Sequence, residues 1–302
     1  MLNDKPAVSL AAVPGKRKAI LELIKEIETR GYHGIYCPSI GDGLALCEAI
    51  ALTTERIEFG TAIAPIYFRS VEEYAATISF IHEISAGRFR FGVGVSHEPA
   101  LSPRGLRNDK PLADTRDFVA NVKAVPRVGD LPPIILGTLR DKMVRLAAEI
   151  SDGIVFANGV RSHMTNSLAT IPHRTMENSN FFIANMIPTC IDENLAAARA
   201  VNRKTLSRYA LLPNYRNYWK AAGYAREMAN VEACISADNI EGVAECLSDR
   251  WLDDTTIAGS PRRVRDEVEK WKAAGIKTPI LVPSSTRGGQ LQAFAELFGV
   301  FG

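Results

Sequence analysis

Few residues with acid–base chemistry stand where the active site of this chain is expected. The sequence alternates predicted strands with predicted helices. In α/β barrels built from such units, the active site forms at the carboxyl ends of the strands. The segments expected there contain His97 and Glu98, with Arg140 and Cys190 as weaker candidates. A metal site would need three converging histidines or carboxylates, and only His97 and Glu98 qualify. We therefore expect no bound metal.

Short apolar runs alternate with amphipathic stretches along the chain. Eight runs predict strands, at residues 7–13, 34–38, 57–64, 89–95, 132–137, 153–158, 181–188 and 279–283. The stretches between them place apolar residues at helical spacing, as over 20–27. Eight such units in 302 residues favour an α/β fold, a closed (β/α)8 TIM barrel, as one domain over 1–302. The helical segment over about 195–249 is then an insertion before the last strand.

The third predicted strand ends abruptly, in "IEFGTAIAPIYFRS" (residues 57–70). The alternation of side chains stops near Ala62–Ile63, and Pro65 has no N–H for further strand pairing. We predict a backbone irregularity at Ala62–Ile63, in the form of a cis peptide bond. The aromatic pair Tyr67 and Phe68 then marks either a turn or the floor of a site for a flat ligand.

Two glycine-containing segments follow strands four and five. "FGVGVSHE" has Gly92 and Gly94 but lacks the third glycine and the distal acid of a dinucleotide fingerprint. These glycines would let a flat group approach the backbone. "GTLRDK" could offer the N–H groups of Gly137 and Thr138, at the start of a helix, to a phosphate. A plain turn and helix cap explains that segment equally well.

Charge and cysteine content narrow the class of protein. The chain has 36 basic and 34 acidic residues, which is no excess for binding nucleic acid. We interpret the basic clusters at 16–18, 199–208 and 262–265 as solvated helix faces. Five cysteines without a C-x-x-C pair suggest neither a disulfide framework nor a zinc site. With no apolar stretch long enough for a signal peptide or a membrane span, we expect a cytoplasmic protein.

Several segments resemble the luciferase-like monooxygenase superfamily, in particular its branch that uses the deazaflavin coenzyme F420. The main one is "TTERIEFGTAIAPIYFRSVEEYAATISFIHEISAGRFRFGVGVSH". Four more are similar to that branch in the expected order, at residues 108–119, 146–158, 196–224 and 258–283. Together these segments cover most of the chain.

The resemblance implies a barrel that holds a flavin or deazaflavin ring at the strand ends and exchanges a hydride with a small organic substrate. In this family the third strand bulges at the residues matching Ala62 and Ile63, commonly through a non-proline cis peptide, and the bulge backs the ring. The cofactor-binding residues that we expect on this basis are Ala62, Ile63, Ala64, Val95, Ser96, Gly137, Thr138, Arg140 and Asn158.

Two residues are the candidates for catalysis. His97 would face the ring edge as a polar catalytic contact, although the sequence favours, by a small margin, a loop histidine bonded to backbone. Ser39 stands where related sequences often carry an acid, and Ser9 stands at a second such place. The chain therefore lacks a carboxylate proton donor at either position, although Ser39 is still expected at the reacting centre.

Two alternatives remain open on the sequence. An FMN-dependent monooxygenase would keep the fold and change the cofactor, and a cofactor-binding protein without turnover would explain the missing acids. The carboxylates of the deazaflavin tail favour F420, because Arg104, Arg107, Lys110 and Arg140 lie in loops at the strand ends. Barrels of this family commonly pair through helices near the second and third strands, which suggests a homodimer.

Overall fold

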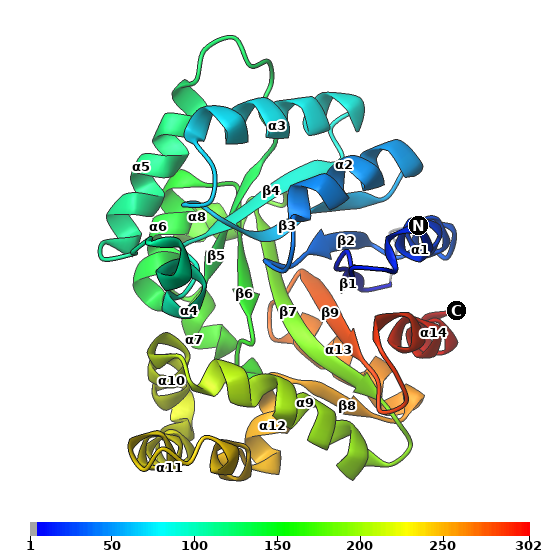
Figure 1. The fold of residues 1–302 in the computed structure, drawn as a ribbon, viewed down its shortest axis with the longest axis vertical. Helices are drawn as coiled ribbons and strands as arrows, with labels where there is room; N and C mark the ends of the chain where they lie inside the picture. The colour runs from blue at the N-terminus through cyan, green and yellow to red at the C-terminus, as the bar shows by residue number, and fades with distance from the viewer. Residues whose placement is uncertain (1–4) are drawn as a thin grey trace. The chain divides into compact units, whose positions relative to one another are not determined.

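The computed structural model describes residues 5–302 as strands that alternate with helices (Figure 1). The strands are β1 Ala7–Ser9, β2 Gly34–Cys37, β3 Glu58–Pro65, β4 Phe89–Gly94, β5 Ile134–Thr138, β6 Gly153–Ala157, β7 Phe182–Ile191, β8 Ile257–Gly259 and β9 Thr278–Ser284. The helices are α1 Arg17–Thr29, α2 Gly43–Thr53, α3 Val71–Ile84, α4 Glu98–Leu101, α5 Pro111–Ala124, α6 Asp141–Ile150, α7 Met164–Leu168, α8 His173–Met176, α9 Leu195–Ala210, α10 Pro213–Trp219, α11 Ala225–Ser236, α12 Asp249–Thr255, α13 Pro261–Ala273 and α14 Gln290–Phe301. Short helical turns are η1 Ser102–Arg104, η2 Arg161–His163, η3 Lys220–Tyr224 and η4 Glu241–Cys246.

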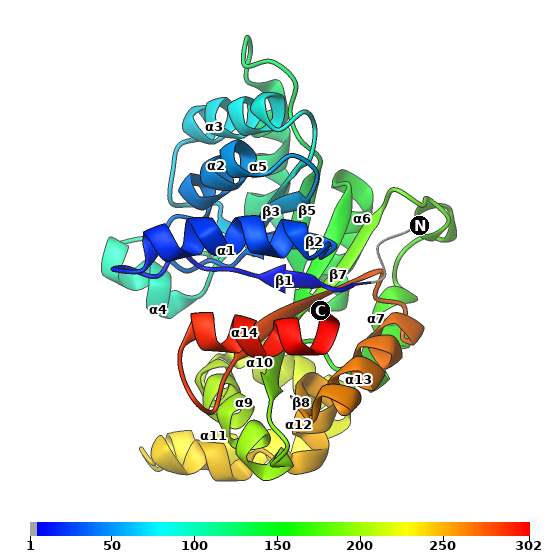
Figure 2. The ribbon, with the colours of Figure 1, turned by 90° about the vertical axis from the view of Figure 1, so that its right-hand side faces the viewer.

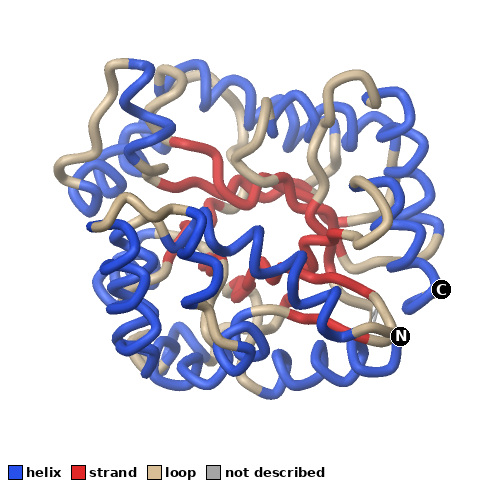
Figure 3. The backbone as a smooth tube through the Cα atoms, turned by 60° about the horizontal axis from the view of Figure 1, so that its bottom comes forward, coloured by secondary structure: helices blue, strands red, loops and turns tan. Residues whose placement is uncertain are grey.

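The chain divides into two compact units. The first runs to Val155 and includes Thr170–Ala184, and the second comprises Phe156–Ala169 and Asn185–Gly302. The division falls within β6 and within β7; β1 to β5 belong to the first unit, where they are hydrogen-bonded in the order β5-β4-β3-β2-β1, and β8 and β9 belong to the second. Parallel strands alternating with helices in this way confirm the expected (β/α)8 barrel fold (Figure 3).

In the first unit the helices follow the order of the strands. Helices α1 and α2, α2 and α3, and α3 and α5 are successive neighbours, as Figure 2 shows for α1 to α3. Local signals fix where these helices begin. The Asp42 carboxylate accepts the N–H groups of Leu44 and Ala45 at the start of α2. Ser70 and Glu73 form a reciprocal capping box at the start of α3.

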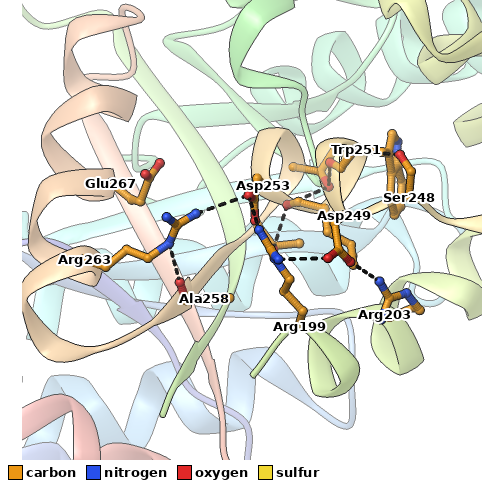
Figure 4. Close-up of polar contacts among 12 residues, drawn as sticks. Arg199, Arg203, Ser248, Asp249, Trp251, Asp253, Ala258, Arg263 and Glu267 are labelled. Atoms are coloured by element: carbon orange, nitrogen blue, oxygen red, sulfur yellow. Dashed lines mark hydrogen bonds and ion pairs between the residues drawn. The ribbon is translucent and has the colours of Figure 1, made fainter. Parts of the chain in front are cut away.

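The second unit contains the helical insertion that the sequence predicts. Helices α9 to α12 precede β8, a three-residue strand that the sequence did not reveal because so short a run has no readable period. Two basic residues of α9, Arg199 and Arg203, are paired with carboxylates rather than merely solvated, as Figure 4 shows. Arg199 donates to Asp253 at 2.5 Å and to Asp249 at 2.8 Å, and Arg203 also binds Asp249.

Some predicted boundaries are corrected by the structure. Strand β1 ends at Ser9, and strand β7 continues to Ile191. The stretch over 96–113, which has no clear period in the sequence, contains α4, η1 and the first turn of α5. Prolines in the first turn start both α4 and α5, where the missing N–H costs nothing. Within residues 5–302, no helix is both long enough and apolar enough to cross a membrane.

Glu28 fixes the turn that leads into β3. Its carboxylate on α1 accepts the backbone N–H groups of Glu55, Arg56 and Ile57, at 3.0, 2.7 and 2.9 Å. Burial alone would raise the pKa of Glu28, but these hydrogen bonds and the charge of Arg56 outweigh it and hold the pKa below the ordinary value of 4.5. The ionised carboxylate therefore stabilises the folded chain.

We expect Glu28→Gln to lower the free energy of unfolding at pH 7 by about 1–2 kcal/mol, because an amide is a weaker acceptor than a carboxylate. A lowered folded-state pKa contributes stability above the unfolded value and loses it as pH falls through the folded value. The difference between variant and parent should therefore shrink below pH 4.5. Thermal unfolding across pH measures it.

Glu22→Gln is the matched control on the same helix. Within residues 5–302, Glu22 pairs only with Lys25, at 3.1 Å in an exposed position, and such pairs contribute little. A pH-independent loss in Glu28→Gln, or an equal effect in the control, would contradict the assignment.

Candidate active site at the ends of strands β2 to β5

Strand β3 contains an extra residue near its end. Thr61 pairs with Phe91, and the next pair is Ala64 with Val93, so β3 advances three residues where β4 advances two. This register shift is a β-bulge and confirms the predicted irregularity at Ala62–Ile63. The prediction of a cis peptide bond was wrong, because no peptide bond among residues 5–302 is cis.

The bulge brings the backbone of β3 directly against Gly92. A Cβ atom on Gly92 would lie 2.1 Å from the carbonyl oxygen of Thr61 and 2.4 Å from that of Ala62. The Thr61 hydroxyl also donates to the Gly92 carbonyl at 2.7 Å. Gly92 therefore makes room for the neighbouring strand, which explains the glycine without a ligand, and the approach of a flat group stays a prediction.

The side chain of Ile63 lies across the ends of β4 and β5. A Cβ atom on Gly94 would lie 2.8 Å from Ile63 Cγ2, and one on Gly137 would lie 3.3 Å from Ile63 Cγ1. Gly94 too is covered by the chain's own side chain rather than left open. The half-buried Ile63 thus forms an apolar surface over two glycines at the strand ends.

A cavity of about 210 Å³ opens beside this surface. Of the predicted site residues, it brings together Ser39, Ile63 and Ala64. Ser39 is exposed at the cavity, whereas Ala62 is almost fully buried in the bulge. The other lining residues are Pro38, Gly41, Asp42, Gly43, Leu44, Thr61, Pro65, Phe68, Arg69 and Tyr74.

Polar contacts hold the rim of the cavity in place. Arg69 donates to the Asp42 carboxylate at 2.6 Å, and the Tyr74 hydroxyl donates to the Pro65 carbonyl at 2.6 Å. Burial raises the pKa of Tyr74 to about 12, so its hydroxyl keeps the proton that it donates. Phe68 lies 4.5 Å from the guanidinium of Arg104, with its ring facing that group. The segment after β3 is therefore a turn that also lines one side of the cavity.

The loop after β4 carries the predicted residues Val95, Ser96 and His97. Ser96 has a φ of 60°, a left-handed conformation that is uncommon outside glycine, and its carbonyl accepts from the Asn108 side chain at 3.3 Å. His97 precedes α4, and its carbonyl accepts the Ala100 N–H at 2.9 Å. Burial lowers the pKa of His97 below 6.5, so its imidazole is neutral at pH 7.

Gly137 and Thr138 are the last residues of β5, and α6 begins only at Asp141. The expectation that their N–H groups start a helix was therefore wrong. Thr138 is buried, and its hydroxyl has no hydrogen-bond partner among residues 5–302. Arg140 is exposed at the N-cap of α6 and has no side-chain capping bond.

Asn158 belongs to the second unit, where it follows β6. It is buried with a φ of 59°, and its carbonyl accepts the indole N–H of Trp219 at 3.2 Å. Its own N–H donates to the Met186 carbonyl at 3.1 Å. These contacts account for its burial, and its role toward a cofactor stays a prediction.

Sequence reasoning missed Asp42, Arg69 and Tyr74 as rim residues. The only signal in the sequence was Asp42 before a helix, which reads as a cap and not as a partner for Arg69. The Tyr74 contact spans the turn between β3 and α3, so the pattern of apolar residues places Tyr74 in the core and leaves its hydroxyl unassigned.

Comparison with known proteins agrees with this geometry. Residues 4–278 match the model of the luciferase-like monooxygenase family. The chain belongs to the luciferase-like monooxygenase family. This luciferase-like chain is thus a member of an oxidoreductase enzyme family.

Relatives and solved structures extend the comparison. A 5,10-methylenetetrahydromethanopterin reductase of Archaeoglobus fulgidus is 24% identical over 83% of each chain. The coenzyme F420-dependent tetrahydromethanopterin reductase of Methanopyrus kandleri has a TM-score of 0.77 at 16% identity, over 97% of each chain. An FMN-bound Baeyer–Villiger monooxygenase component from Pseudomonas putida has a TM-score of 0.67 at 15% identity, over 98% of this chain and 96% of that one.

Gly94→Ala should strain the contact with Ile63 in this luciferase-like chain. We expect the free energy of unfolding to fall by about 1–3 kcal/mol, because the added methyl forces Ile63 from its position. The same substitution should cost less in an Ile63→Ala background, since Cγ2 is then absent. Denaturant unfolding of the four proteins measures the coupling.

Gly299→Ala serves as the control, because nothing lies within 4 Å of a Cβ atom there. It should be neutral or slightly stabilising in its helix. Equal costs of Gly94→Ala in both backgrounds would refute the contact.

Proposed function

We propose that this luciferase-like chain is a coenzyme F420-dependent oxidoreductase that transfers a hydride between the deazaflavin and a small organic substrate. The observation that carries the proposal is the apolar surface of Ile63 over Gly94 and Gly137 at the strand ends. Such a surface suits one face of a planar ring, and the cavity beside it has room for a small reactant. When bound, the deazaflavin would supply the hydride carbon.

The residues at the end of β5 fit an anionic cofactor. A buried hydroxyl without a partner carries a free-energy cost that a ligand oxygen would remove, and Thr138 has such a hydroxyl. The exposed Arg140 follows two residues later and would attract the phosphate or the tail carboxylates. Asp141 in the first turn of α6 argues against an anion held by that helix itself.

His97 and Ser39 are the chain's candidates for handling a proton. The neutral imidazole of His97 can accept or share a proton with a reacting group at pH 7. Ser39 offers a hydroxyl at the cavity. Asp42 is less suited to this task, because its carboxylate already binds Arg69 and two backbone N–H groups. The chemistry would therefore depend mainly on the cofactor.

A Mycobacterium tuberculosis relative supports F420, since its name describes a coenzyme F420-dependent oxidoreductase and it is 25% identical over 77% of this chain and 81% of its own length. An FMN-dependent monooxygenase is the alternative, favoured by the shared fold with the FMN-bound P. putida protein. The tail carboxylates of F420 distinguish the two cofactors, because FMN lacks them.

The five free thiols are compatible with a reducing cytoplasm, where we place the protein.

Titration of the full chain with F420 and with FMN, in separate experiments, tests the proposal. We expect a lower Kd for F420 and a Kd that rises with salt, with each exposed contact adding about 0.2–1 kcal/mol. Arg140→Ala should reduce the salt dependence. Thr138→Val should weaken F420 binding while leaving the unliganded chain as stable as before or more stable, because it removes an unsatisfied hydroxyl.

Each alternative has its own outcome in this experiment. Tighter binding of FMN together with oxygen-dependent turnover would indicate the monooxygenase. Tight F420 binding without oxidation of the reduced cofactor, across carbonyl and imine substrates, would indicate a binding protein without turnover. Binding of neither cofactor would refute the proposal.

We also propose that the chain forms a homodimer through α2 and α3, which are neighbours in the first unit. Their outer faces expose large apolar side chains, Leu52 at 75% and Phe80 at 54%. Sedimentation should show a dimer that Leu52→Glu or Phe80→Glu converts to monomer. Ile240→Glu, at an exposed apolar residue of the second unit, is the control and should stay dimeric. A monomeric parent chain would refute the interface.

A further inference from the structure

Four of the five cysteines lie in two pairs, one in each compact unit. The sulfurs of Cys37 and Cys47 are 3.8 Å apart, and those of Cys234 and Cys246 are 3.5 Å apart. All five cysteines are free thiols. The first pair is buried, whereas both members of the second pair are partly exposed. The second pair alone combines proximity with access for a reagent.

The partly exposed pair joins two elements that already pack together. Cys234 lies on α11 and Cys246 ends η4, and only a short segment separates the two elements. A disulfide has an S–S distance of about 2.0 Å, so the sulfurs must approach by about 1.5 Å. Rotation of the two side chains between staggered conformers covers such a distance.

We propose that Cys234 and Cys246 are a reversible oxidation site that forms an internal disulfide with a small-molecule disulfide as oxidant. One thiol, as its thiolate, attacks the small disulfide, forms a mixed disulfide and releases one thiol molecule. The second protein thiol loses its proton, attacks the mixed disulfide and releases the other. The protein dithiol is oxidised by two electrons, and the small disulfide is reduced to two thiols.

The disulfide would act on the polar network of the second unit. Leu247 directly follows Cys246, and its carbonyl accepts from Arg203 of α9 at 3.1 Å. The next residues, Ser248 and Asp249, begin α12, and Asp249 is a partner of Arg199 and Arg203 (Figure 4). A covalent bond at Cys246 would therefore tie α11 to the segment that leads into this network.

The reaction should be slow in the folded protein. Burial and the hydrogen bond with Cys234 raise the pKa of Cys246 to about 11, so little of its thiolate is present at neutral pH. The buried pair is a matched internal comparison. Burial raises the pKa of Cys47 as well, and the solvent does not reach either sulfur of that pair.

The test is incubation of the native full chain with glutathione disulfide for hours, followed by thiol titration and peptide mapping after alkylation. We expect two of the five thiols to disappear, a single internal cross-link between the peptides of Cys234 and Cys246, and its complete reversal by dithiothreitol. Cys37→Ser should form the same cross-link. Cys234→Ser and Cys246→Ser should form none, and their remaining thiol should carry glutathione instead.

Three results would overturn the proposal. These are five intact thiols after incubation, a cross-link that maps to Cys37 and Cys47, or an internal cross-link that persists in Cys234→Ser. Because the parent chain gives the primary result, the test does not depend on any variant folding. It needs no cofactor either, so it is independent of the proposed function.

Discussion

The extra residue in β3 determines the geometry of the strand ends in the first unit. Its carbonyl groups press on Gly92 so closely that any side chain there would collide at 2.1 Å, and the Thr61 hydroxyl fixes the contact. A strand that kept strict alternation would send neighbouring side chains to opposite faces without interruption. The bulge breaks that rule, and Ile63 comes to cover Gly94 and Gly137. The cavity and its rim are arranged around this deviation.

The fold could be predicted because periodicity is a local property of the sequence. Apolar runs and amphipathic stretches in alternation are enough to indicate parallel strands and a barrel. The place of the irregularity at Ala62–Ile63 was also readable, from the break in alternation before Pro65. Its form was not readable, because a bulge and a cis peptide both redirect a strand. The structure distinguishes them, because β3 and β4 shift register while no peptide bond among residues 5–302 is cis.

The site was less predictable because its contacts join residues that are distant in the sequence. Glycine permits close approach, but the sequence does not say what approaches, so Gly92 was assigned to a ligand although β3 packs against it. The same limit applies to Asp42, whose partner Arg69 lies in another loop. The Asn158 carbonyl accepts the indole N–H of the distant Trp219, and no spacing in the sequence predicts the cysteine pairs. Helix α6 begins only at Asp141 although Leu139 and Arg140 have good helix propensity, because Gly137 and Thr138 belong to β5 and Arg140 is still extended.

The packing of Gly92 also bears on how this barrel could be adapted to new reactants. If a laboratory library randomised all residues at the strand ends together, β3 could not pack against β4 in most of its variants. The productive diversity lies at positions whose side chains border the cavity but support no neighbouring strand. Phe68 is one such position, since it is exposed at the cavity and fills no space that a strand needs. The scaffold thus separates residues that strand packing requires, such as Gly92, from residues that only border the cavity, such as Phe68.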